Sequence, residues 1–493
     1  MRAGVYRFLD CELDLPQRQL RRAGGVVQVE PLILDLLAFL VVERDRVVSR
    51  QEILAAVWKG HPVGSSAVNA CMSRARRAIG DRRGRSGAIR TFSGVGYRLI
   101  AEVQAGASGG GARAPLLGRE VELARLDAIR DAVRAGSGRT VLIAAAAGIG
   151  KTRLARQLAD DCEASGFEVL WGHCDAMPDL PFFWPWTQIL QAAARTRSTS
   201  ALAALARGCE DELARVSPSL RERLRAGVSP DASLTDESRL RVFEATTTCL
   251  LRAAAQRPLA LVIDDLQWSD PASILLLCSL QRAIAGARVL LVGLLCTRSL
   301  PERAATAGVA ALLHHPDVVA LHLDPLPGPQ IERLLRAECP SLTPAIVDTI
   351  AALAGGNPQV AVELGRATQG AAAAASVALV APDDLPIPDR LATAALTELA
   401  ALSADSRSLV EAAAIFARPF SIGALAHLTG RLPADACAAV EEAVERGVLV
   451  ASAAATTFAF RSDLTRECTR RALNPLRRQR LLSAARAPAR GAR

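Results

Sequence analysis

The spacing of hydrophobic and polar residues changes several times along this 493-residue chain. Residues 1–30 alternate weakly, as short strands do, and apolar residues then recur at helical spacing over Pro31–Val42, Arg50–Trp58 and Ser65–Ile79. The sequence IRTFSGVGYRLIAEV alternates again around a Gly-x-Gly turn, which is typical of a hairpin. Strands, three helices and a final hairpin in this order predict a winged helix.

A different pattern covers residues 116–325, where helical segments alternate with short apolar runs. Four of these runs predict buried strands, at Thr140–Ala144, Phe167–Gly172, Leu259–Asp264 and Val289–Leu295. Alternation of this kind is typical of βαβ units, in which helices cover a parallel sheet. The rest of the chain, from about residue 327 onward, is mostly helical in pattern.

Three segments interrupt these patterns. Residues 105–115, AGASGGGARAP, are small and glycine-rich and predict a flexible linker. Residues 371–388 begin as an alanine run and end in PDDLPIP, which indicates a second linker. The polar, irregular stretch Ser217–Ser233 indicates a surface insertion.

Charge, apolar run length and cysteine spacing limit the classes of protein to which this chain can belong. The net charge is +9, and residues 1–104 hold seventeen Lys and Arg against ten Asp and Glu, which suggests a polyanionic partner or else a solvated basic face. No apolar run reaches the roughly 20 residues of a membrane span, and no secretory signal is found. The 11 cysteines lack zinc-ligand spacing. We therefore expect a cytoplasmic, nucleoid-associated protein without structural zinc or disulfides.

The third helix of the basic region has two distinct faces when about 100° is allowed for each residue. Its apolar face, which includes Met72 and Ile79, is expected to pack on the core. The opposite face suits a DNA major groove, where arginine can pair with guanine and asparagine with adenine. Including residues beside the hairpin turn, the predicted DNA contacts are Asn69, Ser73, Arg74, Arg76, Arg77, Arg90, Thr91 and Arg98.

The segments VVSRQEILAAVW, VNACMSRARRAIGD and IRTFSGVGYRLIAEV follow one another in this region. Together they resemble the winged-helix DNA-binding domain of OmpR/PhoB-type transcription regulators, over about residues 5–104. The resemblance implies that Ser66–Ile79 is the recognition helix and that Arg90–Tyr97 opens the wing. A winged helix that docks on a protein instead of DNA is the alternative.

A glycine-containing loop follows the first strand predicted in the central region. It matches the phosphate-binding pattern G-x-x-x-x-G-K-[ST] through Gly148, Ile149, Gly150, Lys151 and Thr152. Backbone N–H groups at the start of the following helix would bind phosphates, Lys151 would add charge, and the Thr152 hydroxyl would bind Mg²⁺. Ala145 stands where the first glycine is expected. The conformational free energy that alanine costs at this position is small if the residue keeps a negative φ.

The segment RPLALVIDDLQWSDPAS is an apolar strand that ends in two adjacent carboxylates, Asp264 and Asp265. Acids at this position beside a phosphate loop can serve ATP hydrolysis. Asp264 would hold Mg²⁺ through water, and Asp265 would orient the attacking water. Without the upstream loop, a helix N-cap or a turn would explain the pair equally well.

Six segments in order, LLGREVELARL, AGIGKTRLARQL, FFWPWTQIL, VIDDLQWSDPAS, LLVGLLCTR and GGNPQVAVEL, resemble the AAA-type signal-transduction ATPases of the STAND class. The resemblance covers residue 116 to about residue 475. It implies that Gly118 and Arg119 lie near the adenine, that Arg298 is a sensor arginine and that Pro358 lines the base pocket. From the residues alone, Arg298 could cap a strand end and GGNP could be an ordinary loop.

The segment FAFRSDL departs from the pattern of the STAND-class ATPases. In the family pattern F-x-F-x-H-[DE], a histidine reads the diphosphate, whereas this chain has FAFRSDL with Ser462 at that position. An off state that depends on bound ADP is therefore not indicated by this segment.

These observations predict a multidomain protein with an α+β winged helix and an α/β ATPase core. The predicted parts are a DNA-binding domain over 1–104, a P-loop ATPase core over 116–325, a helical lid over 326–370 and a winged-helix-like C-terminal domain over 389–493. We expect a transcription regulator that is switched by ATP and ADP, with Mg²⁺ as the metal cofactor, and that binds double-stranded DNA and self-associates. Any hydrolysis of ATP would be slow. The alternatives are a DNA-binding protein with a non-hydrolysing ATPase scaffold and an NTPase whose winged helix binds protein.

Overall fold

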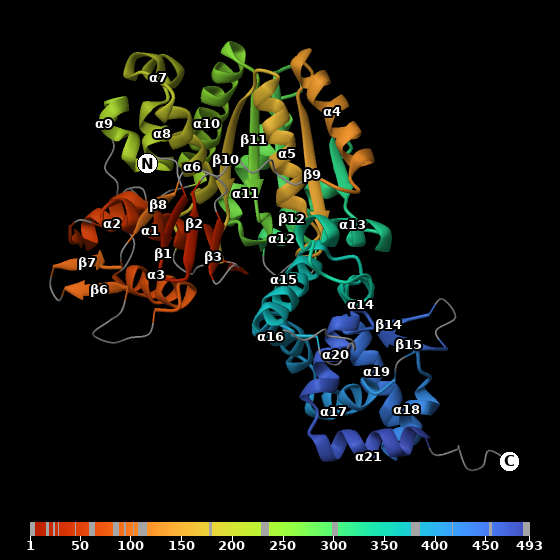
Figure 1. Cartoon of the computed structure of the whole chain (residues 1–493). Coiled ribbons are helices and arrows are strands. Elements are labelled where there is room, and N and C mark those ends of the chain that lie inside the picture. Colours follow the sequence, from red (N-terminus) through yellow and green to blue (C-terminus); the bar gives the residue numbers. More distant parts are fainter. Residues whose placement is uncertain are drawn as a thin grey trace. The chain divides into compact units, whose positions relative to one another are not determined.

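The computed structural model forms two compact units, Met1–Asp324 and Pro325–Arg493 (Figure 1). It describes residues 5–15, 19–22, 25–27, 29–44, 46–58, 65–81, 88–92, 95–101, 103–106, 116–176, 180–227, 236–297, 304–375, 385–416, 418–452 and 456–486.

The N-terminal region of the first unit has the predicted order of strands, three helices and a hairpin. An antiparallel sheet in the order β4-β3-β2-β1-β8 consists of Val5–Phe8, Cys11–Asp14, Gln19–Arg22, Gly25–Val27 and Gln104–Gly106, which are β1 to β4 and β8. A second sheet, β5-β7-β6, consists of Val48–Ser49, Gly96–Leu99 and Ile89–Phe92. The helices are α1 (Pro31–Val42), α2 (Arg50–Val57) and α3 (Ser65–Ala78).

The packing of α3 confirms the predicted division of this helix into two faces. Val68, Met72, Ala75 and Ile79 are at most 1% exposed and belong to one hydrophobic cluster with α1 and α2. The start of α2 is fixed by a capping box, in which Ser49 and Glu52 exchange hydrogen bonds. The polar face of α3 is consequently presented on a rigid support.

The central region contains the expected parallel sheet, in the order β10-β11-β12-β9-β13. All four predicted strands are present, and the pattern missed a fifth at the edge. The strands are β9 (Arg139–Ala145), β10 (Glu168–His173), β11 (Leu259–Asp264), β12 (Val289–Cys296) and β13 (Val318–His322). Because β9 and β11 both flank β12, their carboxyl ends meet at one edge of the sheet.

Helices cover both faces of this sheet because its strands are apolar on both sides. Alternate residues of β9 fall into two hydrophobic clusters: Val141 and Ile143 pack with α4 and α5, whereas Leu142 and Ala144 pack with α6, α10 and α11. The helices are α4 (Glu120–Arg134), α5 (Lys151–Ala164), α6 (Trp184–Arg195), α7 (Thr199–Ala206), α8 (Glu210–Val216), α9 (Arg221–Leu224), α10 (Asp236–Gln256), α11 (Pro271–Ala283), α12 (Ala304–Leu313) and the 3₁₀ turns η1 (Pro218–Leu220) and η2 (Leu266–Trp268).

Two stretches interpreted as irregular contain regular structure. The described part of the expected insertion, residues 217–227, holds η1 and α9, and its side chains Ser217, Leu220 and Leu224 are buried. Apolar residues at helical spacing in this short polar stretch were too few to indicate a helix. Likewise β8 includes the first two residues of the expected linker 105–115, because residues 104–106 pair with β1.

The second unit is helical apart from one hairpin. Its helices are α13 (Gly328–Glu338), α14 (Pro344–Ala354), α15 (Pro358–Ala375), α16 (Asp389–Ala400), α17 (Ala404–Ala413), α18 (Ile422–Thr429), α19 (Pro433–Glu445), α20 (Asp463–Ala472) and α21 (Pro475–Arg486). The antiparallel strands β14 (Leu449–Ala451) and β15 (Phe458–Phe460) follow α19. The helix α15 extends into the linker expected at 371–388.

Candidate nucleotide site and DNA-reading surface

The loop between β9 and α5 has the backbone of an anion site. Gly148 and Gly150 have φ of 80° and 108°, in the left-handed region that favours glycine. A Cβ added to Gly150 would meet nothing within 4 Å, so open space lies beside the start of α5. No side chain caps this helix, and its first N–H groups can bind phosphate oxygens.

Ala145 fits this loop without strain. It is the last residue of β9, where it is opposite Cys296 of β12, and it is 4% exposed. Among the described non-glycine residues, positive φ occurs at Leu9, Phe183, Arg225 and Asp265, and therefore not at Ala145. The condition under which alanine can replace the first glycine is met.

Lys151 is buried beside the loop, with 8% of its surface exposed. Its ammonium donates hydrogen bonds to the carbonyl oxygens of Ala145, at 3.2 Å, and Ala146, at 3.1 Å. These two carbonyl groups orient the Lys151 side chain, but they are neutral and do not cancel its positive charge. The positive charge therefore stays available to an anionic ligand.

The two motifs meet at the carboxyl edge of the sheet. The Thr152 hydroxyl donates a 3.1 Å hydrogen bond to Asp264, which is 5% exposed and lies 112 positions later in the chain. Burial, followed by the nearby Asp265 carboxylate, raises the pKa of Asp264, and the hydrogen bond from Thr152 opposes this shift. A hydroxyl and a buried carboxylate beside a phosphate loop are hard oxygen donors that fit Mg²⁺.

Asp265 is held in an unusual backbone conformation. Its φ is 57°, which is costly for a residue with a side chain and is typical of functional sites. Gln267 fixes the carboxylate by donating to it at 2.8 Å, and Gln267 accepts in turn from the backbone N–H of Cys296 at 2.9 Å. Our sequence reasoning missed Gln267, although its position two residues after the acidic pair was visible.

His173 is a second residue that the sequence reasoning missed. In the parallel register of β10 and β11 it lies opposite Asp264, and its Nδ1 is 4.0 Å from the Asp264 carboxylate. Its ring stacks on Trp171 with centroids 5.8 Å apart. A histidine at the carboxyl end of a predicted parallel strand was the available signal.

The remaining predicted nucleotide residues have structural partners of their own. Arg119 is 5% exposed and donates to the carbonyls of Asp324, at 2.7 Å, and Ile149, at 3.4 Å, so it ties the phosphate loop to the end of the first unit. Gly118 precedes it with φ of 71°. The predicted contacts of both residues with adenine stay predictions, and Arg298 lies outside the described residues.

In the second unit, GGNP forms the junction of two helices. Gly355 ends α14 with φ of 54°, and Asn357 caps α15 by accepting from the backbone N–H groups of Gln359 and Val360. Pro358 is the first residue of α15, and its role in a base pocket stays a prediction. Ser462 caps α20 by accepting from the N–H of Thr465 at 3.2 Å, which gives this serine a structural role.

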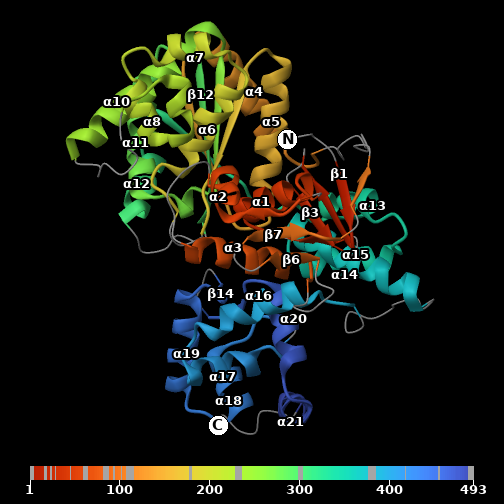
Figure 2. The ribbon, with the colours of Figure 1, turned by 90° about the vertical axis from the view of Figure 1, so that its left-hand side faces the viewer.

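The DNA-reading surface consists of the polar face of α3 and the β6–β7 wing beside it (Figure 2). The Asn69 amide oxygen accepts from Arg50, at 3.0 Å, and from the Tyr97 hydroxyl, at 3.1 Å. Arg74 forms an ion pair with Glu30 at 3.0 Å. Both predicted base-reading side chains therefore have internal partners in this structure.

Other predicted DNA contacts divide into exposed and engaged side chains. Arg76 joins α3 to the wing, because it donates to the Ile89 carbonyl at 3.0 Å and to Thr91 at 2.8 Å. Arg98 donates to the Arg44 carbonyl at 3.0 Å. The residues Arg77, Arg90 and Thr91 are exposed, and Ser73 is half-buried.

Two protein families match the chain. The family "Transcriptional regulatory protein, C terminal", of the OmpR/PhoB type, matches residues 24–99, and the family "AAA ATPase domain" matches residues 115–292. The transcriptional regulatory protein AfsQ1 of Streptomyces coelicolor is 35% identical over 93 residues, 19% of this chain and 41% of that protein. An uncharacterized protein of Rhizobium meliloti is 28% identical over 261 residues, 50% of this chain and 24% of that protein.

The chain thus spans less than half the length of either curated relative. Among solved structures, it is similar to the DNA-binding domain of E. coli CadC, with 28% identity, 22% of this chain and 100% of that chain covered, and a TM-score of 0.20. It is also similar to the Thermotoga maritima RuvB Holliday junction branch migration motor, with 16% identity, 70% and 93% covered, and a TM-score of 0.32.

Three further features of the described residues concern membrane spans, thiols and metal ligands. Within these residues no helix combines the length and the apolar character needed to cross a membrane. All 11 cysteines are free thiols in this structure. Groups of three or more potential metal ligands among His, Cys, Asp and Glu do not occur in the part of the chain that the structure describes.

Proposed function

We propose that this chain, which contains an OmpR/PhoB-type DNA-binding domain and an AAA ATPase domain, is a transcription regulator whose DNA binding is switched by ATP and ADP. The observation that carries the proposal is the hydrogen bond between Thr152 and Asp264 beside Lys151. It joins the phosphate loop to the acidic strand end in the same chain that holds the DNA-reading surface.

In this proposal, the first N–H groups of α5 and the Lys151 ammonium bind the nucleotide phosphates. Thr152 and Asp264 would hold Mg²⁺, Asp264 through water, and the ion would supply positive charge beside the phosphates. Asp265, fixed by Gln267, orients a water for slow hydrolysis. Gly118, Arg119, Arg298 and Pro358 keep the adenine-pocket and sensor roles that the family resemblance implies.

Nucleotide exchange changes the relative populations of conformations and so the affinity for DNA. The proposed partners are double-stranded promoter DNA and further copies of this chain, whose association would follow the nucleotide state. The C-terminal residues 389–493 form a winged-helix-like domain in this proposal, with α17 to α19 followed by the β14–β15 hairpin.

The test is genome-wide mapping of bound DNA with the wild type and Lys151→Ala, combined with binding of a fluorescent ATP analogue. We expect discrete wild-type sites whose occupancy changes in the variant, and nucleotide binding that the variant lacks. DNA sites that are identical in both proteins would favour a nucleotide-independent scaffold. The absence of DNA sites, together with intact ATP binding, would favour a winged helix that binds protein.

A further inference from the structure

The segment between β10 and α6 joins the ATPase region to the winged helix. Trp184, the first residue of α6, is 4% exposed and belongs to the hydrophobic cluster formed by α1, α2 and α3. Leu180 packs against the same cluster. This segment therefore supplies part of the core of the DNA-binding domain, although it is more than 70 positions away in the chain.

Asp175 of the same segment occupies the start of α1. Its carboxylate, 5% exposed, accepts a 3.4 Å hydrogen bond from the backbone N–H of Leu32. The helix lacks a cap of its own, because Glu30 at the N-cap position makes no side-chain cap and Pro31 has no N–H. A carboxylate at a helix N-terminus is stabilising, so Asp175 caps α1 from the ATPase region.

The same segment also contacts Asp264, the residue that would hold Mg²⁺ in the proposed function. The backbone N–H of Cys174, the residue before Asp175, donates to the carbonyl of Asp264 at 3.0 Å. His173 lies directly opposite Asp264 in the sheet. One hydrogen-bonded strand end therefore connects the Asp264 backbone to Asp175.

The capped end of α1 also carries a contact with the DNA-reading surface. Glu30, the N-cap residue, holds Arg74 of α3 in an ion pair at 3.0 Å. Asp175 and Glu30 therefore act on the same helix end, one from the ATPase region and one toward the recognition helix. In this arrangement, the Arg74 guanidinium has the Glu30 carboxylate as its partner.

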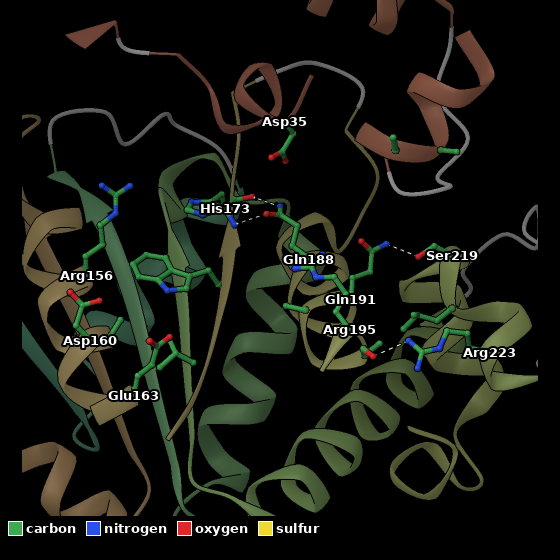
Figure 3. A pocket seen from close by; sticks show the side chains of 18 residues that line it. Asp35, Arg156, Asp160, Glu163, His173, Gln188, Gln191, Arg195, Ser219 and Arg223 are labelled. Atoms are coloured by element: carbon green, nitrogen blue, oxygen red, sulfur yellow. Dashed lines mark hydrogen bonds between the residues drawn. The ribbon is translucent and has the colours of Figure 1, made fainter. Parts of the chain in front are cut away.

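The contact between the two regions leaves room for movement. A cavity of about 1010 Å³ is lined by residues of both regions (Figure 3). It is lined by Asp35, Ala55 and Ala56 of the winged helix and by residues of α5, β10 and α6 that include His173 and Gln188. Close packing does not lock the winged helix along this side.

We propose that Asp175 is a positioning residue that couples the nucleotide site to the recognition helix, by capping α1 in the state in which Glu30 retains Arg74. This inference rests on the proposed function, because it assigns the route by which nucleotide changes DNA affinity. Nucleotide binding shifts the strand end at Asp264, withdraws the Asp175 cap and frees the start of α1. Arg74 then exchanges Glu30 for DNA.

The test measures the affinity of the full-length chain for a fluorescent duplex recovered by the genome mapping, with and without Mg-ATP. In the wild type the two affinities should differ by at least about 5-fold, in the range typical of coupled sites. Asp175→Ala should reduce this factor to less than about 2-fold, mainly by raising the affinity measured without ATP. Because ATP binding has to withdraw the same cap, Asp175→Ala should bind the fluorescent ATP analogue at least as tightly as the wild type.

Asp175→Asn is the conservative variant, because asparagine caps helices as well as aspartate does, and it should keep most of the coupling. Asp131→Ala, an exposed residue of α4, is the matched control and should keep all of it. Wild-type coupling in Asp175→Ala, with a melting curve that shows a folded chain, would overturn the inference. So would an Asn variant that loses as much coupling as Ala. Equal affinities in the wild type would instead overturn the proposed function.

Discussion

Lys151 and Asp264 at the phosphate loop are 8% and 5% exposed, whereas Arg77 and Arg90 on the DNA-reading surface are exposed. The first pair lies at the edge of a parallel sheet, where backbone carbonyls and Thr152 already orient both side chains. The second pair lies on a helix and a wing strand, with freedom to adapt. In the proposed function, nucleotide binding would use preorganised groups, whereas DNA binding would use exposed side chains together with side chains that change partners.

The largest effect should come from the preorganised site. Lys151→Ala removes the buried positive charge beside the loop, and we expect ATP affinity to fall by about 100-fold, or ~2.7 kcal/mol. Titration with a fluorescent ATP analogue measures this loss. Arg134→Ala, an exposed arginine in the last turn of α4, is the control and should bind normally. An unchanged affinity in Lys151→Ala would show that this loop does not bind the phosphates.

The exposed region should respond with two opposite changes. Arg74→Ala should weaken DNA binding by roughly 10-fold or more, because a base contact of arginine contributes ~1–3 kcal/mol.

Glu30→Gln should strengthen DNA binding, since it releases Arg74 from its ion pair. Fluorescence anisotropy at several salt concentrations measures both changes. Weaker binding in Glu30→Gln would contradict the partner exchange.

A smaller effect is expected at Ser462. Its hydroxyl caps α20, so Ser462→Ala should destabilise the second unit by about 1 kcal/mol without changing ADP affinity. Thermal unfolding and ADP titration separate the two properties. Ser462→Thr, which retains a capping hydroxyl, should recover the stability. A marked loss of ADP affinity in Ser462→Ala would assign this residue to the nucleotide instead.

The smallest effect should come from restoring the first glycine of the loop. Ala145 has no positive φ and is buried in β9, so Ala145→Gly removes a packed methyl group and adds backbone freedom. We expect ATP affinity within about 2-fold of the wild type and stability lower by ~0.5–1 kcal/mol. A large gain in ATP affinity would show that the alanine impairs the site.

Local sequence patterns predicted several elements of the fold and part of the candidate site. The bounds of α1 and β11 agree with their apolar patterns, and the buried face of α3 was visible from helical spacing. Local motifs placed Thr152 and Asp264, and the sheet brings them together as the βαβ pattern implies.

Contacts distant in sequence could not be predicted. Gln267 and His173 had local signals in the sequence, but their contacts with Asp265 and Asp264 depend on the strand register and loop structure. Nothing in the local pattern around Asp175 indicates that it caps α1, because this contact joins residues 143 positions apart. The partners of Arg74 and Asn69 depend on tertiary packing in the same way.

The central claim is that the nucleotide state sets the affinity for DNA. The most direct measurement is the dissociation constant of the full-length chain for one mapped duplex, with and without Mg-ATP, in the wild type and in Lys151→Ala. We expect Mg-ATP to change the dissociation constant by at least about 5-fold in the wild type and to leave it unchanged in Lys151→Ala. Equal affinities with and without Mg-ATP in the wild type, under conditions in which ATP is bound, would contradict it.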